Sequence, residues 1–139
     1  MIVVDASAVF ASLDRSQRAY TDVSRFLEIA RERLVLSPFV LAELDYLLST
    51  RIGPEAAFEL LRDVEAGAYL LAPVGAEDVS ASLRVLEQFD DLGIGLADAS
   101  IVVLAARYGT DRVLTLDERH FRALQTLDGR PFTLLPADA

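Results

Sequence analysis

The chain contains no cysteine and only one histidine in 139 residues. The lack of cysteine excludes disulfide bonds and thiol chemistry. The chain does not begin with the basic residues and long apolar stretch of a signal peptide. Its longest uninterrupted apolar run, 101–106, is far shorter than the roughly 20 residues that span a bilayer. We therefore expect a cytoplasmic protein that does not insert into a membrane.

Positive charge is also scarce. All 13 basic residues are arginines, and they face 22 acidic residues, so the net charge is 13 − 22 = −9. This balance ordinarily argues against a nucleic-acid partner and favours a basic protein partner. The objection to nucleic acid is not decisive, because a bound metal ion reverses the local potential where a phosphate approaches.

The length and the composition are those of one folded domain, which we expect to comprise residues 1–139. A hydrophobic content of 53% with 25% charged residues is typical of a folded globular protein, and the apolar excess indicates oligomerisation.

Short β-branched or aliphatic runs alternate with segments of helical periodicity. Strands are predicted at 2–4, 34–36, 69–71, 112–116 and 132–135, and helices at 6–13, 15–33, 38–50, 54–67, 76–89 and 96–108. Ser37 and Pro38 are a helix N-cap and a first helical residue. Strands separated by helices imply parallel pairing through right-handed crossovers. We therefore predict a three-layer α/β/α sandwich with a short, mostly parallel sheet.

Four carboxylates, Asp5, Glu43, Asp98 and Asp117, interrupt apolar segments that are far apart in the sequence. Asp5 and Asp117 follow the first and fourth predicted strands, at the sheet edge where ligands bind in such folds. A buried carboxylate costs several kcal/mol unless a partner compensates it. The common pattern therefore indicates a metal site.

Three of the four acids, each taken alone, also have a structural explanation. Asp5, Asp98 and Asp117 could cap helices or turns. Glu43 lies in mid-helix, where capping fails, and its neighbours at helical spacing are Phe39, Val40, Tyr46 and Leu47. We therefore predict that Glu43 lies on the apolar stripe and points toward the core.

A converging set of carboxylates is stable mainly around a cation, because the carboxylates repel one another. Ligation by oxygen alone suits Mg²⁺, with Mn²⁺ as a possible substitute. Such ions retain part of their water shell in proteins and bind substrate phosphate.

At these positions the sequence resembles the PIN-domain nucleases, and within them the VapC-type toxins of bacterial toxin–antitoxin pairs. The resemblance covers essentially the whole chain and rests on the order and spacing of four motifs. They are Met1–Ala8 (MIVVDASA), Ser37–Leu44 (SPFVLAEL), Leu96–Ser100 (LADAS) and Leu114–Asp117 (LTLD) followed by Phe121.

The resemblance implies an Mg²⁺-dependent endoribonuclease whose site is built from the four acids. It thereby implies metal-assisted phosphodiester hydrolysis, with Asp5 and Asp98 as direct ligands and Glu43 and Asp117 holding ligand waters or a second ion. It also implies an RNA substrate, a cognate VapB-type antitoxin that covers the acidic groove, and a homodimer. Ser7 and Thr115 match hydroxyl residues that support the site in the family, and Asp91 resembles an acidic loop position of some members. Because lysine is absent, no particular RNA contact can be carried over.

Several other residues near the last acid have plain structural interpretations. Arg112, Arg119 and Arg122 are at least as well explained as solvated loop charges. His120 is expected to be a structural or exposed loop residue, and the late position of Arg107 in its helix suits the helix dipole.

Other classes fit less well. A receiver domain requires a lysine, and a haloacid-dehalogenase-like phosphatase requires Asp rather than Ser7 two residues after the first acid. The strongest alternative is a non-catalytic metal-dependent binding module with an Asp-x-Ser-x-Ser motif. Val9 replaces the second serine of that motif, and Glu43 adds an acid that the motif does not need.

Overall fold

The computed structural model describes residues 1–139 and contains five strands and seven α-helices. The strands are β1 (Ile2–Val4), β2 (Leu34–Leu36), β3 (Leu70–Leu71), β4 (Arg112–Leu114) and β5 (Thr133–Leu135). The helices are α1 (Ala6–Leu13), α2 (Tyr20–Ile29), α3 (Pro38–Arg51), α4 (Pro54–Glu65), α5 (Ala76–Gln88), α6 (Leu96–Arg107) and α7 (Glu118–Phe121), with a 3₁₀ turn η1 (Asp90–Leu92) before α6.

The strands form a single sheet in the order β3-β2-β1-β4-β5, and every neighbouring pair is parallel. After β1 the chain adds β2 and β3 on one side of the sheet, and then returns to add β4 and β5 on the other. The reversal leaves a crevice beyond the carboxyl ends of β1 and β4, which is the usual ligand site of an open α/β sheet. The predicted sheet is confirmed, and it is wholly parallel.

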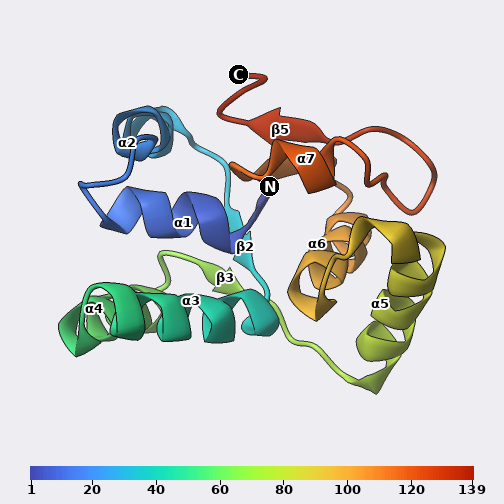
Figure 1. The fold of residues 1–139 in the computed structure, drawn as a ribbon, viewed down its shortest axis with the longest axis horizontal. Helices are drawn as coiled ribbons and strands as arrows, with labels where there is room; N and C mark the ends of the chain where they lie inside the picture. Colours follow the sequence, from blue (N-terminus) through green and yellow to red (C-terminus); the bar gives the residue numbers. More distant parts are fainter.

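The helices cover both faces of the sheet, which confirms the predicted three-layer sandwich. In Figure 1, α1, α2 and α4 lie to the left of β2, α3 begins beneath the strands and runs to the left, α5 and α6 lie to the right, and α7 lies next to β5. Helices α1 and α3 run side by side away from the sheet. None of the helices combines the length and the apolar character that a bilayer crossing requires.

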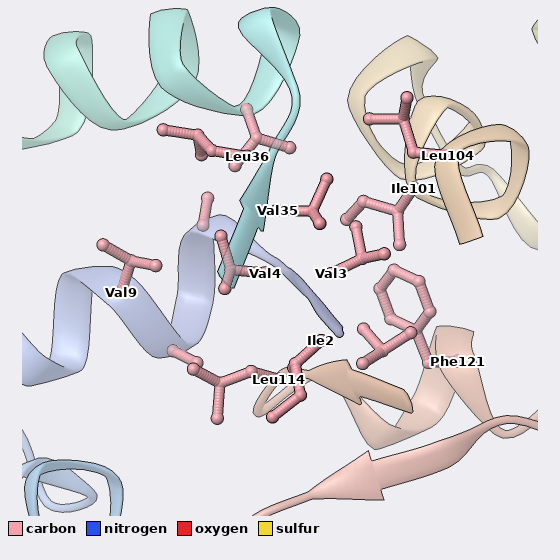
Figure 2. Packing of buried hydrophobic residues seen from close by; sticks show 14 of the residues in the cluster. Ile2, Val3, Val4, Val9, Val35, Leu36, Ile101, Leu104, Leu114 and Phe121 are labelled. Carbon is pink, nitrogen blue, oxygen red and sulfur yellow. The ribbon is translucent and has the colours of Figure 1, made fainter. Parts of the chain in front are cut away.

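The core consists of apolar side chains from both faces of the central strands. Figure 2 shows Val3 and Val35 directed toward Ile101 and Leu104 of α6, while Val4 lies on the side of α1. These residues are almost completely buried. Burial of one such side chain contributes roughly 1.5–3 kcal/mol, so the core fixes the position of β1 and of the residue that follows it.

Several predicted segments are shorter in the structure, among them α2 and β4. Helix α2 begins at Tyr20 rather than near residue 15, because Asp14 accepts hydrogen bonds from the backbone N–H and the hydroxyl of Ser16 and turns the chain. Strand β4 ends at Leu114 rather than at Leu116. Beyond it, the N–H of Leu116 donates to the hydroxyl of Ser7, so the backbone leaves the sheet at the candidate site.

Candidate functional site

A groove beyond the carboxyl ends of β1 and β4 contains all four predicted acids. Its volume of about 450 Å³ lies in the range of ligand pockets. It is lined by Asp5, Ala6, Ser7, Phe10, Gln17, Glu43, Leu47, Arg51, Asp98, Leu116, Asp117 and His120. The structure therefore brings together acids that the sequence separates by up to 112 positions (117 − 5).

Asp5 follows β1 and is the most deeply placed of the acids, with 6% of its surface exposed. Its Oδ2 accepts hydrogen bonds from the hydroxyls of Ser7, at 2.6 Å, and Thr115, at 2.7 Å. Asp5 makes no side-chain capping bond to α1, so the capping explanation fails for this residue. Both hydroxyls contact the same oxygen, which leaves Oδ1 without a hydrogen bond from the protein.

Ser7 and Thr115 also fix the chain on the opposite side of the groove. The hydroxyl of Thr115 accepts from the backbone N–H of Asp117 at 2.9 Å, and that of Ser7 accepts from Leu116 at 3.0 Å. The two hydroxyls therefore connect Asp5 to the segment that carries Asp117. Both residues therefore contact the acid that the family resemblance expects them to support.

Asp117 begins the short helix α7. Its Oδ1 accepts from the backbone N–H of His120 at 3.1 Å, and its Oδ2 lies 2.7 Å from Nδ1 of the same residue. The capping explanation is therefore correct for Asp117, which nevertheless lines the groove. His120 lies in the groove wall and positions this acid, a contact that follows from their spacing of three residues in a helical turn.

Asp98 lies in the first turn of α6. Its Oδ2 accepts a long 3.5 Å hydrogen bond from the N–H of Gly95, so it caps the helix weakly. The preceding loop reverses at Gly93, whose φ of +68° is a conformation that residues with a side chain rarely adopt. That turn directs the start of α6, and with it Asp98, toward the groove.

Glu43 is the one acid whose predicted orientation is wrong. It is exposed at the groove rim and does not point into the core. The buried stripe of α3 consists of Val40, Leu44 and Leu48, and Tyr46 is 68% exposed. The prediction failed because it counted the exposed Tyr46 as part of the apolar stripe.

The acids interact electrostatically. Partial burial raises the pKa of Asp98 to about 6, with further contributions from the negative charges of Asp5, Asp117 and Glu43. Burial, followed by the charge of Asp5, also raises the pKa of Glu43. No arginine forms an ion pair with any of the four acids. The charges of these four carboxylates are therefore not neutralised by an arginine.

The donor set fits a hard divalent cation that keeps part of its water shell. No three acidic or histidine side chains lie close enough to enclose an ion by themselves. Mg²⁺ is commonly bound by one or two carboxylates with several retained waters, so such an enclosure is not required. Oδ1 of Asp5, which lacks a protein partner, and the uncompensated Asp98 are the groups best suited to direct ligation.

Other sequence predictions can be compared with the positions of their residues. Asp91 lies exposed in η1 and does not line the groove. Arg112 pairs with Glu32, Arg122 pairs with Glu118 and Asp138, and Arg107 pairs with Asp78. The interpretation of these arginines as structural or surface charges therefore agrees with the structure.

Two polar groove residues, Gln17 and Arg51, were missed by the sequence analysis. Gln17 lies in the turn after α1 and donates to Asp14. The signal for Arg51 was its spacing of eight residues from Glu43, since positions i, i+4 and i+8 follow one ridge of a helix.

The chain is similar to known proteins over nearly its full length. A profile of the PIN domain family matches residues 2–126. Ribonuclease VapC26 of Mycobacterium tuberculosis is 42% identical over 135 residues, covering 97% of this chain and 100% of the relative.

Solved structures share the fold at lower identity. The VapC20 toxin of Mycobacterium tuberculosis, described as cleaving the sarcin–ricin loop, superposes with a TM-score of 0.84 at 21% identity, covering 94% of this chain and 100% of that one. VapBC2 of Rickettsia felis, bound to a DNA fragment from its promoter, gives a TM-score of 0.66 at 18% identity, covering 96% and 98%. FitAcB of Neisseria gonorrhoeae gives 0.61 at 22% identity, covering 95% and 96%. With its fold, its motifs and its acidic groove all in agreement, this chain belongs to the PIN domain family and is a VapC-type member of it.

Proposed function

We propose that the protein is an Mg²⁺-dependent endoribonuclease toxin that hydrolyses RNA phosphodiester bonds and is neutralised by a cognate VapB-type antitoxin. The observation that carries the proposal is the meeting of Asp5, Glu43, Asp98 and Asp117 in one groove, where none of them forms an ion pair with an arginine. The 42% identity to a protein named as a ribonuclease supports the same activity.

Asp5 and Asp98 are the proposed direct ligands, and Glu43 and Asp117 are proposed to hold ligand waters. The exposed rim position of Glu43 suits a contact through water, and the two bonds from His120 to Asp117 occupy both of its oxygens. When bound, a divalent cation activates the attacking water and stabilises negative charge on the phosphoryl oxygens. Mn²⁺ is the expected substitute for Mg²⁺.

The remaining steps depend on the chain itself. Ser7 and Thr115 hold Oδ2 of Asp5, so its free Oδ1 keeps a fixed direction without rearrangement during the reaction. Hydrolysis forms a bond from the water oxygen to phosphorus and breaks the bond to a ribose oxygen. The water loses a proton to a groove carboxylate or to solvent, and the departing oxygen gains one.

We infer the protein partners from the net charge and from the exposed apolar side chains. The net charge of −9 and the acidic groove support an antitoxin that presents basic side chains to that groove. Exposed apolar side chains, including Phe58, Leu61 and Leu83, support a homodimer or a further antitoxin contact. We propose cytoplasmic RNA as the substrate.

The decisive experiment is cleavage-site mapping on total RNA with purified protein in Mg²⁺, in Mn²⁺ and in EDTA. The wild type should cut RNA at few positions in either metal and lose activity in EDTA. The variant Asp5→Asn should lose cleavage and keep the fold. Asp45→Asn is the matched control, because Asp45 is an exposed acid of α3 that does not line the groove.

Cleavage that survives Asp5→Asn or EDTA would contradict the proposal. Metal binding measured by calorimetry, together with no cleavage of any RNA, would instead support the non-catalytic metal-dependent binding module. If Asp45→Asn also abolishes cleavage, then the loss of a surface charge, and not the loss of a metal ligand, explains the inactivity of Asp5→Asn.

A further inference from the structure

The groove extends beyond the acids along helix α3. Glu43, Leu47 and Arg51 all line it, and their spacing of four residues places them along one ridge of the helix. At 1.5 Å per residue, Arg51 lies about 12 Å further along α3 than Glu43. Figure 1 shows α3 running beside α1 over this length, with its Arg51 end away from the strands. The groove therefore has an acidic end at the sheet and a distal end between two helices.

Arg51 provides the only arginine side chain among the groove-lining residues. Its guanidinium carbon lies 5.8 Å from the centre of the ring of Phe10, a residue of α1 that is 6% exposed. This cation–π contact connects the two helices that border the distal end. Arg51 forms no salt bridge and no side-chain hydrogen bond with the protein. Its donors are therefore available, while its stem is positioned by Phe10.

Most other arginines differ from Arg51 in one of two ways. Some are neutralised by acids, as Arg107, Arg112, Arg122 and Arg130 are. The others do not line the groove. In a chain of net charge −9, a free guanidinium held in the groove is the one fixed cation that can attract a phosphate there.

We infer that Arg51 binds a phosphate of the RNA backbone next to the one that is cleaved, and so orients the strand along the groove between α1 and α3. The guanidinium fork matches the oxygens of a phosphate and can bind two of them at once. The inference rests on the proposed ribonuclease function. It makes Arg51 a positioning residue, because the phosphate that it would bind is not the one that is cleaved.

The test compares Arg51→Gln with the wild type in RNA cleavage, with kcat and KM measured separately. KM should rise roughly 10-fold to 100-fold, because one charge-assisted contact is lost, and kcat should change far less. The slope of the logarithm of RNA affinity against the logarithm of salt concentration should become shallower by about 0.7, the share of one phosphate on a single strand. Affinity is measured in the Asp5→Asn background, where the RNA stays intact.

Arg62→Gln is the matched control. Arg62 is an exposed arginine in the last turn of α4, as Arg51 is in α3, but it does not line the groove. Its KM and salt slope should equal those of the wild type. Arg51→Lys should keep the salt slope, because the charge remains, and should show an intermediate KM, because the fork is lost. This variant keeps the inference testable if Arg51→Gln does not fold.

Different results would overturn different claims. If Arg51→Gln is folded and cleaves RNA with the KM and the salt slope of the wild type, the role of Arg51 is overturned and the ribonuclease proposal stays intact. Absence of metal-dependent cleavage by the wild type would overturn the ribonuclease proposal and, with it, the role of Arg51. An equal rise of KM in Arg62→Gln would show that general charge, and not the position of Arg51, attracts RNA.

Discussion

Replacement of Asp98 by asparagine should stabilise the metal-free protein. Partial burial and the charges of Asp5, Asp117 and Glu43 raise the pKa of Asp98 from 3.8 to about 6. At neutral pH the folded protein therefore contains a carboxylate that it would hold more easily in the protonated form. Asparagine removes that charge and keeps an oxygen that can accept from Gly95.

The expected gain in stability follows from the size of the pKa shift of Asp98. A rise of about two pKa units corresponds to about 3 kcal/mol at 1.36 kcal/mol per unit. Because Asp98 is only partly buried, solvent screening reduces this figure, and we expect a gain of about 1–2 kcal/mol. For a chain of this length the gain corresponds to an increase of roughly 3–8 °C in Tm.

The sign of the pH dependence provides the sharper test. Between pH 3.8 and about 6 the folded state keeps a proton that the unfolded state has released, so the wild type loses stability as pH rises through this window. The advantage of Asp98→Asn should therefore be nearly absent at pH 3.5 and complete above pH 7.

The assay is thermal denaturation in EDTA at pH 3.5 and pH 7.5, with Asp45→Asn as the control that should match the wild type at both. Added Mg²⁺ should narrow the difference at pH 7.5, because the ion stabilises the wild type more than the variant. No gain at pH 7.5, or an equal gain at pH 3.5, would refute the electrostatic reasoning.

Two further predictions concern activity. Thr115→Val removes the hydroxyl that donates to Asp5 and accepts from Asp117, so kcat/KM for RNA should fall roughly 10-fold to 100-fold. Thr115→Ser keeps the hydroxyl and should retain most activity. An equal loss of activity in both variants would argue against the role of the hydroxyl. The pKa of Asp98 is raised to about 6 in the metal-free groove. The rate of single-turnover cleavage at subsaturating Mg²⁺ should therefore fall as the pH drops below about 6, by up to about tenfold per pH unit. A rate that stays constant from pH 5 to 8 would contradict a requirement for ionised Asp98.

The sequence predicted those parts of the site that depend on strand ends. A β-branched run followed by an acid identified Asp5, and the same pattern identified Asp117, because parallel strands bring their carboxyl ends to one edge. The hydroxyl partners Ser7 and Thr115 came from the family resemblance, and the structure provides their hydrogen bonds to Asp5.

The remaining features depend on packing that a linear pattern does not encode. The side of α3 that faces solvent is set by α1, α4 and α6, and for this reason Glu43 lies beside the buried stripe and Tyr46 is exposed. The place of Arg51 in the groove depends on the approach of α1 to α3. Asp91 was predicted from a loop resemblance, and the turn that contains it leaves its side chain exposed outside the groove.

The sheet order also has a consequence for synthesis of the protein. Strand β1 is made first, yet its neighbour β4 and the acid Asp117 come from the last third of the chain. Thr115, which fixes the first acid, also belongs to this late segment. A nascent or truncated chain that stops before residue 115 therefore lacks both the support of Asp5 and one of the four acids. The acidic groove is therefore completed only after the segment that contains the first four strands has been synthesised.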